Sequence, residues 1–245
     1  MAQKTGKRGL CFIIWVAVFI FVLPVSAQET AHDWFKKGFD AGQSGKFEEA
    51  LSAYTKAIQL NPKLWEAYYN RGIAYGGLGK YPEAVKDYGQ AIDLKPDNAE
   101  IYNNRGYAYV MSGNDAQAIR DYSKALDLDP KRAETHFNRG IAYMNAGETG
   151  KAMEDFTKAI ELDSEYAEAY VNRGRLYEMM KDYPGAVSDY SEAIDINSKM
   201  SEAYYNRGVA YARMEQYERA VRDYSKALEL EPRNGRAYTN RGIAY

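Results

Sequence analysis

Apolar and small residues recur along this chain at spacings of three and four, which places their side chains on one face of an α-helix. One such run passes through Tyr68, Gly72 and Tyr75, and a second run starts at Tyr81 and continues to Ala91. The pattern therefore predicts two consecutive amphipathic helices joined by a tight turn.

This predicted pair of helices repeats with a fixed period of 34 residues, without an insertion or deletion. The period is clearest in one glycine and two alanines of each unit. The glycines are Gly38, Gly72, Gly106, Gly140, Gly174, Gly208 and Gly242, and the alanines are Ala50, Ala84, Ala118, Ala152, Ala186 and Ala220, then Ala57, Ala91, Ala125, Ala159, Ala193 and Ala227. A period in this range is typical of a solenoid, so we predict an all-α α-solenoid, which offers an extended surface rather than an enclosed pocket.

Counting each unit so that the recurring glycine is position 8 gives six full units and an incomplete one. The full units cover 31–64, 65–98, 99–132, 133–166, 167–200 and 201–234, a partial seventh covers 235–245, and residues 28–30 form a short junction before them. The seventh unit stops before its second helix and without a polar capping helix. We therefore expect a fragment, or an end that pairs with another chain.

The first 27 residues have a different pattern. Three basic residues precede an unbroken apolar run, 10–23, which Pro24 and the small or apolar residues 25–27 follow. This three-part pattern predicts a signal peptide over 1–27. The apolar run is shorter than the roughly 20 residues that span a bilayer, so a retained N-terminal anchor is the alternative. Either way the repeats are expected outside the cytoplasm, periplasmic or secreted, with membrane contact only through an uncleaved 1–27.

Composition and chemistry-bearing residues argue for a folded chain without catalysis. Apolar residues make up 46% and charged residues 27% of the sequence, and the net charge of −2 gives no electrostatic footprint for nucleic acid. His32 and His136 are the only histidines, and Cys11, the only cysteine, lies in the signal segment. No metal-ligand spacing and no glycine-rich phosphate loop accompanies them. We therefore predict no enzyme activity, no cofactor and no metal.

The residues that recur in register make the chain resemble a known repeat family. Those of the first unit are Trp34, Gly38, Ala41, Gly45, Phe47, Ala50, Tyr54, Ala57 and Pro62, and the pattern returns through residue 234. They resemble the tetratricopeptide repeat, over essentially everything after the signal segment. The resemblance implies a right-handed superhelix of helix-turn-helix units that binds proteins or peptides.

The resemblance also implies where a partner binds. Positions 2, 5, 6, 9, 12 and 13 of each first helix share one face, and in tetratricopeptide proteins that face lines the concave groove. Position 6 is asparagine in six successive units: Asn70, Asn104, Asn138, Asn172, Asn206 and Asn240. Each amide offers a donor and an acceptor, so the row can hold the main chain of an extended peptide or simply bridge helices. Positions 5 and 9 vary and would select side chains, notably through Tyr69, Tyr107, Phe137, Arg175 and Tyr205.

Charge recurs at three further positions. Position 2 is Glu66, Glu100, Glu134, Glu168 and Glu202, which disfavours an acidic carboxyl-terminal tail and favours basic or neutral segments. Position 7 carries Arg71, Arg105, Arg139, Arg173 and Arg207, and position 23 carries Asp87, Asp121, Asp155, Asp189 and Asp223. Because two antiparallel helices joined near position 15 bring positions 7 and 23 level, we predict a structural Arg–Asp pair in each of these units.

Taken as a whole, the sequence predicts an exported, non-enzymatic scaffold that holds an extended segment of a protein or peptide in its groove. Two alternatives stay open. The repeats can be the targeting or assembly arm of a larger envelope enzyme or complex, or a homo-oligomer that stacks through the uncapped C-terminal end.

Overall fold

The computed structural model describes residues 29–245, and the predicted signal segment, 1–27, lies outside the described residues. Within 29–245 all the regular secondary structure is helical. The helices are α1 (Ala31–Gln43), α2 (Phe47–Leu60), α3 (Trp65–Gly77), α4 (Tyr81–Leu94), α5 (Ala99–Met111), α6 (Asp115–Leu128), α7 (Ala133–Asn145), α8 (Thr149–Leu162), α9 (Ala167–Met179), α10 (Tyr183–Ile196), α11 (Ser201–Arg213), α12 (Tyr217–Leu230) and α13 (Gly235–Ala244).

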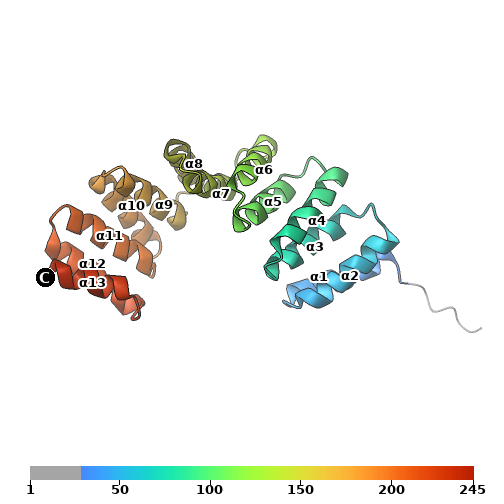
Figure 1. Ribbon diagram of the computed structural model, residues 1–245, viewed down its shortest axis with the longest axis horizontal. Helices are drawn as coiled ribbons and strands as arrows, with labels where there is room; N and C mark the ends of the chain where they lie inside the picture. Colours follow the sequence, from blue (N-terminus) through green and yellow to red (C-terminus); the bar gives the residue numbers. More distant parts are fainter. Residues whose placement is uncertain (1–28) are drawn as a thin grey trace, which may run out of the picture.

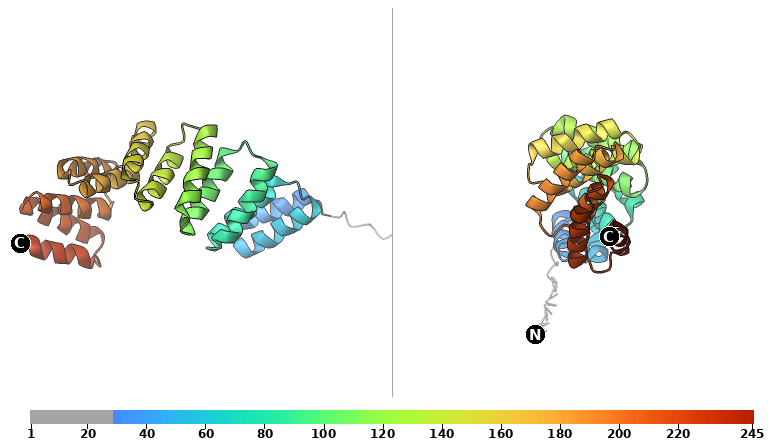
Figure 2. Two further views of the ribbon diagram at one scale, coloured as in Figure 1. Left: turned by 45° about the horizontal axis from the view of Figure 1, so that its top comes forward. Right: turned by 90° about the vertical axis from the view of Figure 1, so that its left-hand side faces the viewer.

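The helices pack as successive pairs, in which each odd-numbered helix lies against the even-numbered helix that follows it. Each even-numbered helix also packs on the next odd-numbered one, so contacts join neighbours in the sequence. Figure 1 shows the result as an arch, with α5, α7 and α9 towards its inner side and α6, α8 and α10 outside. The two further views in Figure 2 show the array winding as it advances. The predicted right-handed α-solenoid is confirmed.

The recurring small residues let the two helices of a unit approach closely. A Cβ atom added at Gly106 on α5 would lie 2.8 Å from the ring of Tyr122 on α6, and the same clash recurs in the other full units. Tyr122 is 1% exposed, so its ring has no room to move away. The recurring alanines, such as Ala118, are buried for the same reason: a larger side chain would separate the helices.

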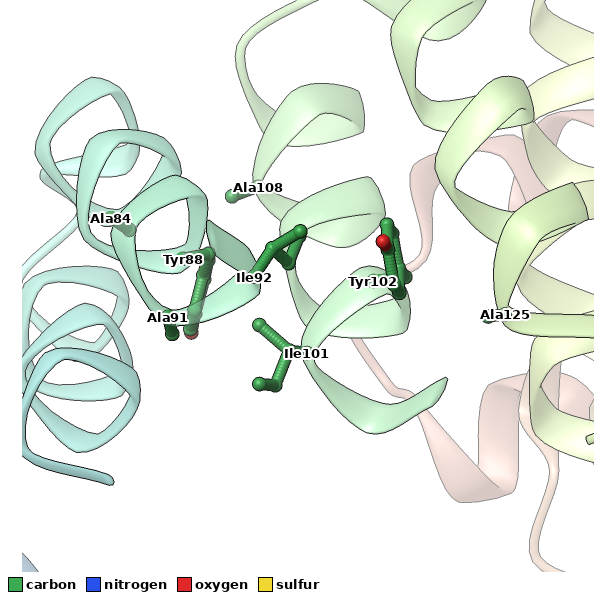
Figure 3. Packing of buried hydrophobic residues seen from close by; sticks show 8 residues of the cluster. All are labelled: Ala84, Tyr88, Ala91, Ile92, Ile101, Tyr102, Ala108 and Ala125. Atoms are coloured by element: carbon green, nitrogen blue, oxygen red, sulfur yellow. The ribbon is translucent and has the colours of Figure 1, made fainter. Parts of the chain in front are cut away.

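Apolar side chains also fill the joint between one unit and the next. Figure 3 shows Ile92 of α4 directed towards α5, where Ile101 and Ala108 lie on the facing side. Ile101 is fully buried, so this joint excludes solvent as well as the interior of a unit does. The core is therefore continuous along the array, as stacking repeats require.

The turn inside each unit needs a left-handed backbone at position 15. Glycine supplies it in four units, and Gly79 and Gly113 there have φ of 70° and 74°. In the fifth and sixth units the same turn is made by Lys181 and Glu215, with φ of 64° and 61°. A side chain in this conformation is strained because its Cβ crowds the backbone.

Replacing Lys181 by glycine is therefore expected to raise the free energy of unfolding by about 1 kcal/mol, the strain that a Cβ atom adds in this region. The reverse substitution, Gly113→Lys, makes a matched control and should lower the free energy of unfolding by a similar amount. Urea denaturation of both variants measures the two effects. An unchanged midpoint for Lys181→Gly would show that the turn carries no strain.

Candidate peptide-binding groove

In each full unit from the second to the sixth, an arginine of the first helix forms an ion pair with an aspartate of the second helix, and we call this pair a brace. The guanidinium group on the first helix donates from Nε and Nη2 to both carboxylate oxygens on the second helix, at 2.7 to 3.0 Å in all five units. The five aspartates are buried, between 4% and 7% exposed. The predicted Arg–Asp pairs are confirmed, and their two-pronged geometry is the strongest form that such a pair takes.

The same arginine also holds the preceding unit. Arg71 donates from Nη1 to the hydroxyl of Thr55, 16 residues earlier, and its aspartate Asp87 lies 16 residues later. A serine or threonine takes this role at most of the other joints. Gly89 is the exception, because it has no hydroxyl to offer Arg105. The hydrogen bond to Asp87 raises the pKa of Arg71, so the guanidinium stays charged despite its burial.

His136 joins the Arg–Asp pair of the fourth unit. Its Nδ1 atom lies 3.0 Å from Oδ1 of Asp155, and its Nε2 atom lies 3.2 Å from the carbonyl oxygen of Pro130. Burial alone would raise the pKa of Asp155, but hydrogen bonds from Arg139 and His136 outweigh it and lower that pKa. Within residues 29–245 no three histidine, cysteine or acidic side chains gather as a metal site would need.

The inner face of the array is formed by one stripe of each first helix. Positions 2, 6, 9 and 13 follow one another at one turn each, for example Glu100, Asn104, Tyr107 and Met111 on α5. Shallow recesses open where the stripe of one unit meets the next. Three of them have volumes of about 180, 300 and 270 Å³, and Asn70, Asn240 and Asn206 line them respectively.

Three of the six asparagines at position 6 bridge to the preceding unit. Asn104 donates from Nδ2 to the hydroxyl of Tyr69 at 2.8 Å, and Asn240 donates to the hydroxyl of Tyr205 at 3.1 Å. Asn138 lies 3.4 Å from the side-chain oxygen of Asn103. The acceptor is in each case the side chain at position 5, 35 residues earlier. These amides connect helices and also border the groove.

The other asparagines do not reach the preceding unit. Asn70 and Asn172 donate from Nδ2 to the carbonyl oxygens of Glu66 and Glu168, one turn back in their own helices, both at 2.8 Å. Position 5 of the unit before each of them is a phenylalanine, Phe35 or Phe137, which offers no acceptor. Asn206 follows a unit with valine at that position. The sequence of the preceding unit therefore decides where each amide points.

Position 5 packs more tightly than the sequence suggests. The ring of Phe137 lies 5.7 Å from that of Phe156 and 4.8 Å from that of Tyr166, between centroids. Tyr69 and Tyr205 are half-buried in the same way, each 5.9 Å from the aromatic ring at position 24 of its unit. Asn103 and Val171 are 2% and 3% exposed. For those two units the expectation that position 5 varies to select partner side chains is wrong, because the side chains are inaccessible.

Position 9 is the exposed, variable part of the stripe. Tyr107 is 50% exposed and Ile73 is 40% exposed, large values for apolar or aromatic side chains in a folded protein. Arg175 is exposed too, with Nη1 lying 3.4 Å from the side-chain oxygen of Asn172. It borders a recess with Glu178, whose pKa is raised by burial despite the hydrogen bond from Tyr190. The structure thus brings the predicted residues of positions 6 and 9 together on one face.

An array of helix pairs with continuous joints, internal braces and an open inner face defines a helical-repeat binding scaffold as the class of protein. Models described as "TPR repeat" match residues 43–79, 77–113, 106–147 and 180–215. Models described as "Tetratricopeptide repeat" match 133–166, 201–234 and 156–188. The chain belongs to the tetratricopeptide repeat family.

Solved structures of similar fold come from several settings. A chain of the APC/C hetero-tetramer Cut9–Hcn1 is 18% identical with a TM-score of 0.71, covering 88% of this chain, which spans only 42% of that one. MamA is 28% identical over 67% of this chain and 96% of its own, with a TM-score of 0.62. PilW, a type IV pilus biogenesis factor, is 18% identical over 87% and 99%, with a TM-score of 0.75. No curated protein sequence matches the chain.

Proposed function

We propose that this protein is a non-enzymatic scaffold that acts outside the cytoplasm and holds an extended segment of a partner protein in its inner groove. The observation that carries the proposal is the row of half-buried asparagine amides beside exposed apolar side chains such as Ile73 and Tyr107. Amides can pair with the main chain of any sequence, and the exposed side chains beside them can choose among sequences.

Two further observations support it. The same Arg–Asp pair recurs in units two to six, so the buried charged groups of these units have a structural role. The inner face is therefore proposed for binding rather than catalysis. The basic start, apolar run and small residues of 1–27 support export. Among residues 29–245, no helix combines the length and the hydrophobicity needed to cross a membrane.

The asparagines that do not bridge units give the sharpest test. Replacing Asn172 and Asn206 by alanine removes two groove amides without breaking a bond between units, whereas Asn104 and Asn138 also connect helices. We expect the double variant to bind its partner about tenfold more weakly, since each lost hydrogen bond contributes roughly 0.5–1.5 kcal/mol. Gln59→Ala with Gln90→Ala, two exposed amides on the second helices, is the matched control.

The measurement is capture of partners by the mature chain from its own envelope extract, quantified by mass spectrometry for wild type, groove variant and control. A partner lost only in the groove variant supports the proposal. Capture that is equal in all three would place binding elsewhere, and light scattering of residues 28–245 would then test self-association. The mass of the chain recovered from cells tests export, because cleavage after Ala27 leaves Gln28 first.

A further inference from the structure

We propose that the groove is built for an extended basic segment in which cationic and apolar side chains alternate. The inference rests on the proposed function and names the chemistry of the occupant. It comes from three parallel rows that cross the first helices of units two to four. The glutamate row is Glu66, Glu100 and Glu134; the asparagine row is Asn70, Asn104 and Asn138; the apolar row is Ile73, Tyr107 and Ile141.

The three rows lie side by side because their spacing along each helix is one turn. Glu100, Asn104 and Tyr107 follow one another at four and three residues on α5, so the asparagine lies between the other two. A segment that runs along the asparagine row therefore has carboxylates on one side and apolar side chains on the other. Successive side chains of an extended chain point to opposite sides. A sequence that alternates lysine or arginine with apolar residues fits this arrangement.

Two of the three glutamates in the row, Glu66 and Glu100, lack the ion pairs that acidic side chains form elsewhere in residues 29–245. On the second helices and in the loops, Glu49, Asp97, Glu161 and Glu229 each lie within 3.4 Å of a lysine nitrogen. In the part of the chain that the structure describes, Glu134 is the one glutamate at position 2 with a cation within 4.0 Å. Among the described residues no cation of this chain pairs with Glu66 or Glu100, so these two carboxylates can pair with cations of a partner.

The asparagine row also offers hydrogen-bond acceptors to a partner. Asn70, Asn104 and Asn138 all use Nδ2 to bond within the protein, to a carbonyl oxygen, a hydroxyl and an amide oxygen respectively. Each side-chain oxygen has two lone pairs, and that of Asn104, which already accepts from Nδ2 of Asn103 at 3.4 Å, keeps one for a further donor. Amide oxygens beside carboxylates make a lining rich in acceptors, which matches main-chain N–H groups and cationic side chains better than it matches carboxylates.

The apolar row ends at the fifth unit, and the place where it ends determines where the bound basic segment lies along the groove. Position 9 changes there from Ile141 to Arg175, and Arg213 at position 13 of the next unit is exposed as well. A cationic segment is repelled by these two arginines. The basic part of the bound segment therefore lies over units two to four, and the part that lies over Asn172 and Asn206 is not basic.

Three short synthetic peptides test the chemistry: alternating lysine and leucine, alternating glutamate and leucine, and alternating lysine and serine. We expect the lysine–leucine peptide to bind the mature chain, measured by fluorescence anisotropy, at least tenfold more tightly than the other two. Equal binding of the lysine–leucine and glutamate–leucine peptides would overturn the proposal. So would equal binding of the lysine–serine peptide, because the apolar row would then contribute nothing.

Variants of the chain then locate the site. Replacing Glu66, Glu100 and Glu134 by glutamine should weaken lysine–leucine binding about tenfold, since three exposed charge pairs with the peptide are lost. The matched control replaces Glu48, Glu83 and Glu218, exposed glutamates in the first turns of α2, α4 and α12, so that losses at helix N-termini are equal. An equal loss in both triple variants would show general charge attraction and overturn the assignment to the glutamate row.

Arg175 offers a test in the opposite direction. Arg175→Ile extends the apolar row by one unit and should tighten lysine–leucine binding about fivefold, since the new side chain is partly buried against the peptide and a repelling charge is removed. Arg175→Gln removes only the charge and should give a smaller gain. No gain from Arg175→Ile would contradict the placement of the segment. These outcomes are separate from the proposed function, because envelope partners lost in the Asn172 and Asn206 variant would still show groove binding if the peptides failed.

Discussion

Replacing Asp155 by alanine is expected to lower the free energy of unfolding by about 3–5 kcal/mol, the loss typical of a broken buried ion pair. Asp155 is 4% exposed and accepts two hydrogen bonds from Arg139, at 2.8 and 2.9 Å, with His136 Nδ1 at 3.0 Å. Alanine would leave the guanidinium without its counter-charge between two helices. Urea denaturation followed by circular dichroism measures the effect.

The neighbouring Glu154 is exposed, so Glu154→Ala is the control and should change stability by less than about 0.5 kcal/mol. The dependence of stability on acidic pH gives a second test of the Asp155 carboxylate. Because the pKa of Asp155 is lowered below its ordinary value of 3.8, its contribution is complete above that pH and is lost as the pH falls through the lowered pKa. Asp155→Ala should therefore lose less stability than wild type below pH 3.8. Parallel acid titrations would contradict this.

Gly106→Leu is expected to destabilise the array by about 3 kcal/mol or more, at the upper end for overpacking. A Cβ atom at this position would already lie 2.8 Å from Cε1 and 2.9 Å from Cδ1 of Tyr122, a buried ring held by the core. The longer side chain would force α5 and α6 apart. Thermal unfolding should begin at a lower temperature in the variant.

A helical glycine on the inner face makes the matched control. Gly76 has no atom within 4 Å of an added Cβ, so Gly76→Leu gains helix propensity without a clash. It should stabilise the chain by about 0.5–1 kcal/mol, the difference between glycine and a good helix former. If both leucine variants shifted stability in the same direction, the close approach of α5 and α6 would not explain the glycine at position 8.

The fold and its braces could be predicted from the sequence because they depend on residues of the same unit. The helices follow from the spacing of residues such as Tyr68 and Gly72, and the pairing of Arg71 with Asp87 follows from one turn that brings two helices level. Repetition strengthened both predictions, since every unit had to satisfy the same geometry.

The candidate groove could be predicted only in part, because the hydrogen-bond partner of each asparagine side chain depends on the residue 35 positions earlier. Asn104 bridges to the hydroxyl of Tyr69, whereas Asn172 turns back to its own helix because Phe137 offers no acceptor. Comparing position 6 with position 5 of the preceding unit would have revealed this rule. The burial of Asn103 was harder to foresee, since it depends on Thr135 of the next unit, whose hydroxyl lies 3.1 Å from it.

Each bracing arginine contacts residues that lie the same number of positions before and after it, and this regularity affects how the array can change in length. Arg173 donates to Asp189, 16 residues later in the chain, and to Thr157, 16 residues earlier. These two bonds therefore depend only on the distance along the chain. Removing 133–166 would bring Ser123 to Arg173 in place of Thr157, another hydroxyl at the same offset. Duplication or loss of a whole unit therefore keeps the arginine bond across the new joint, and the reach of the protein can be set in steps of one repeat.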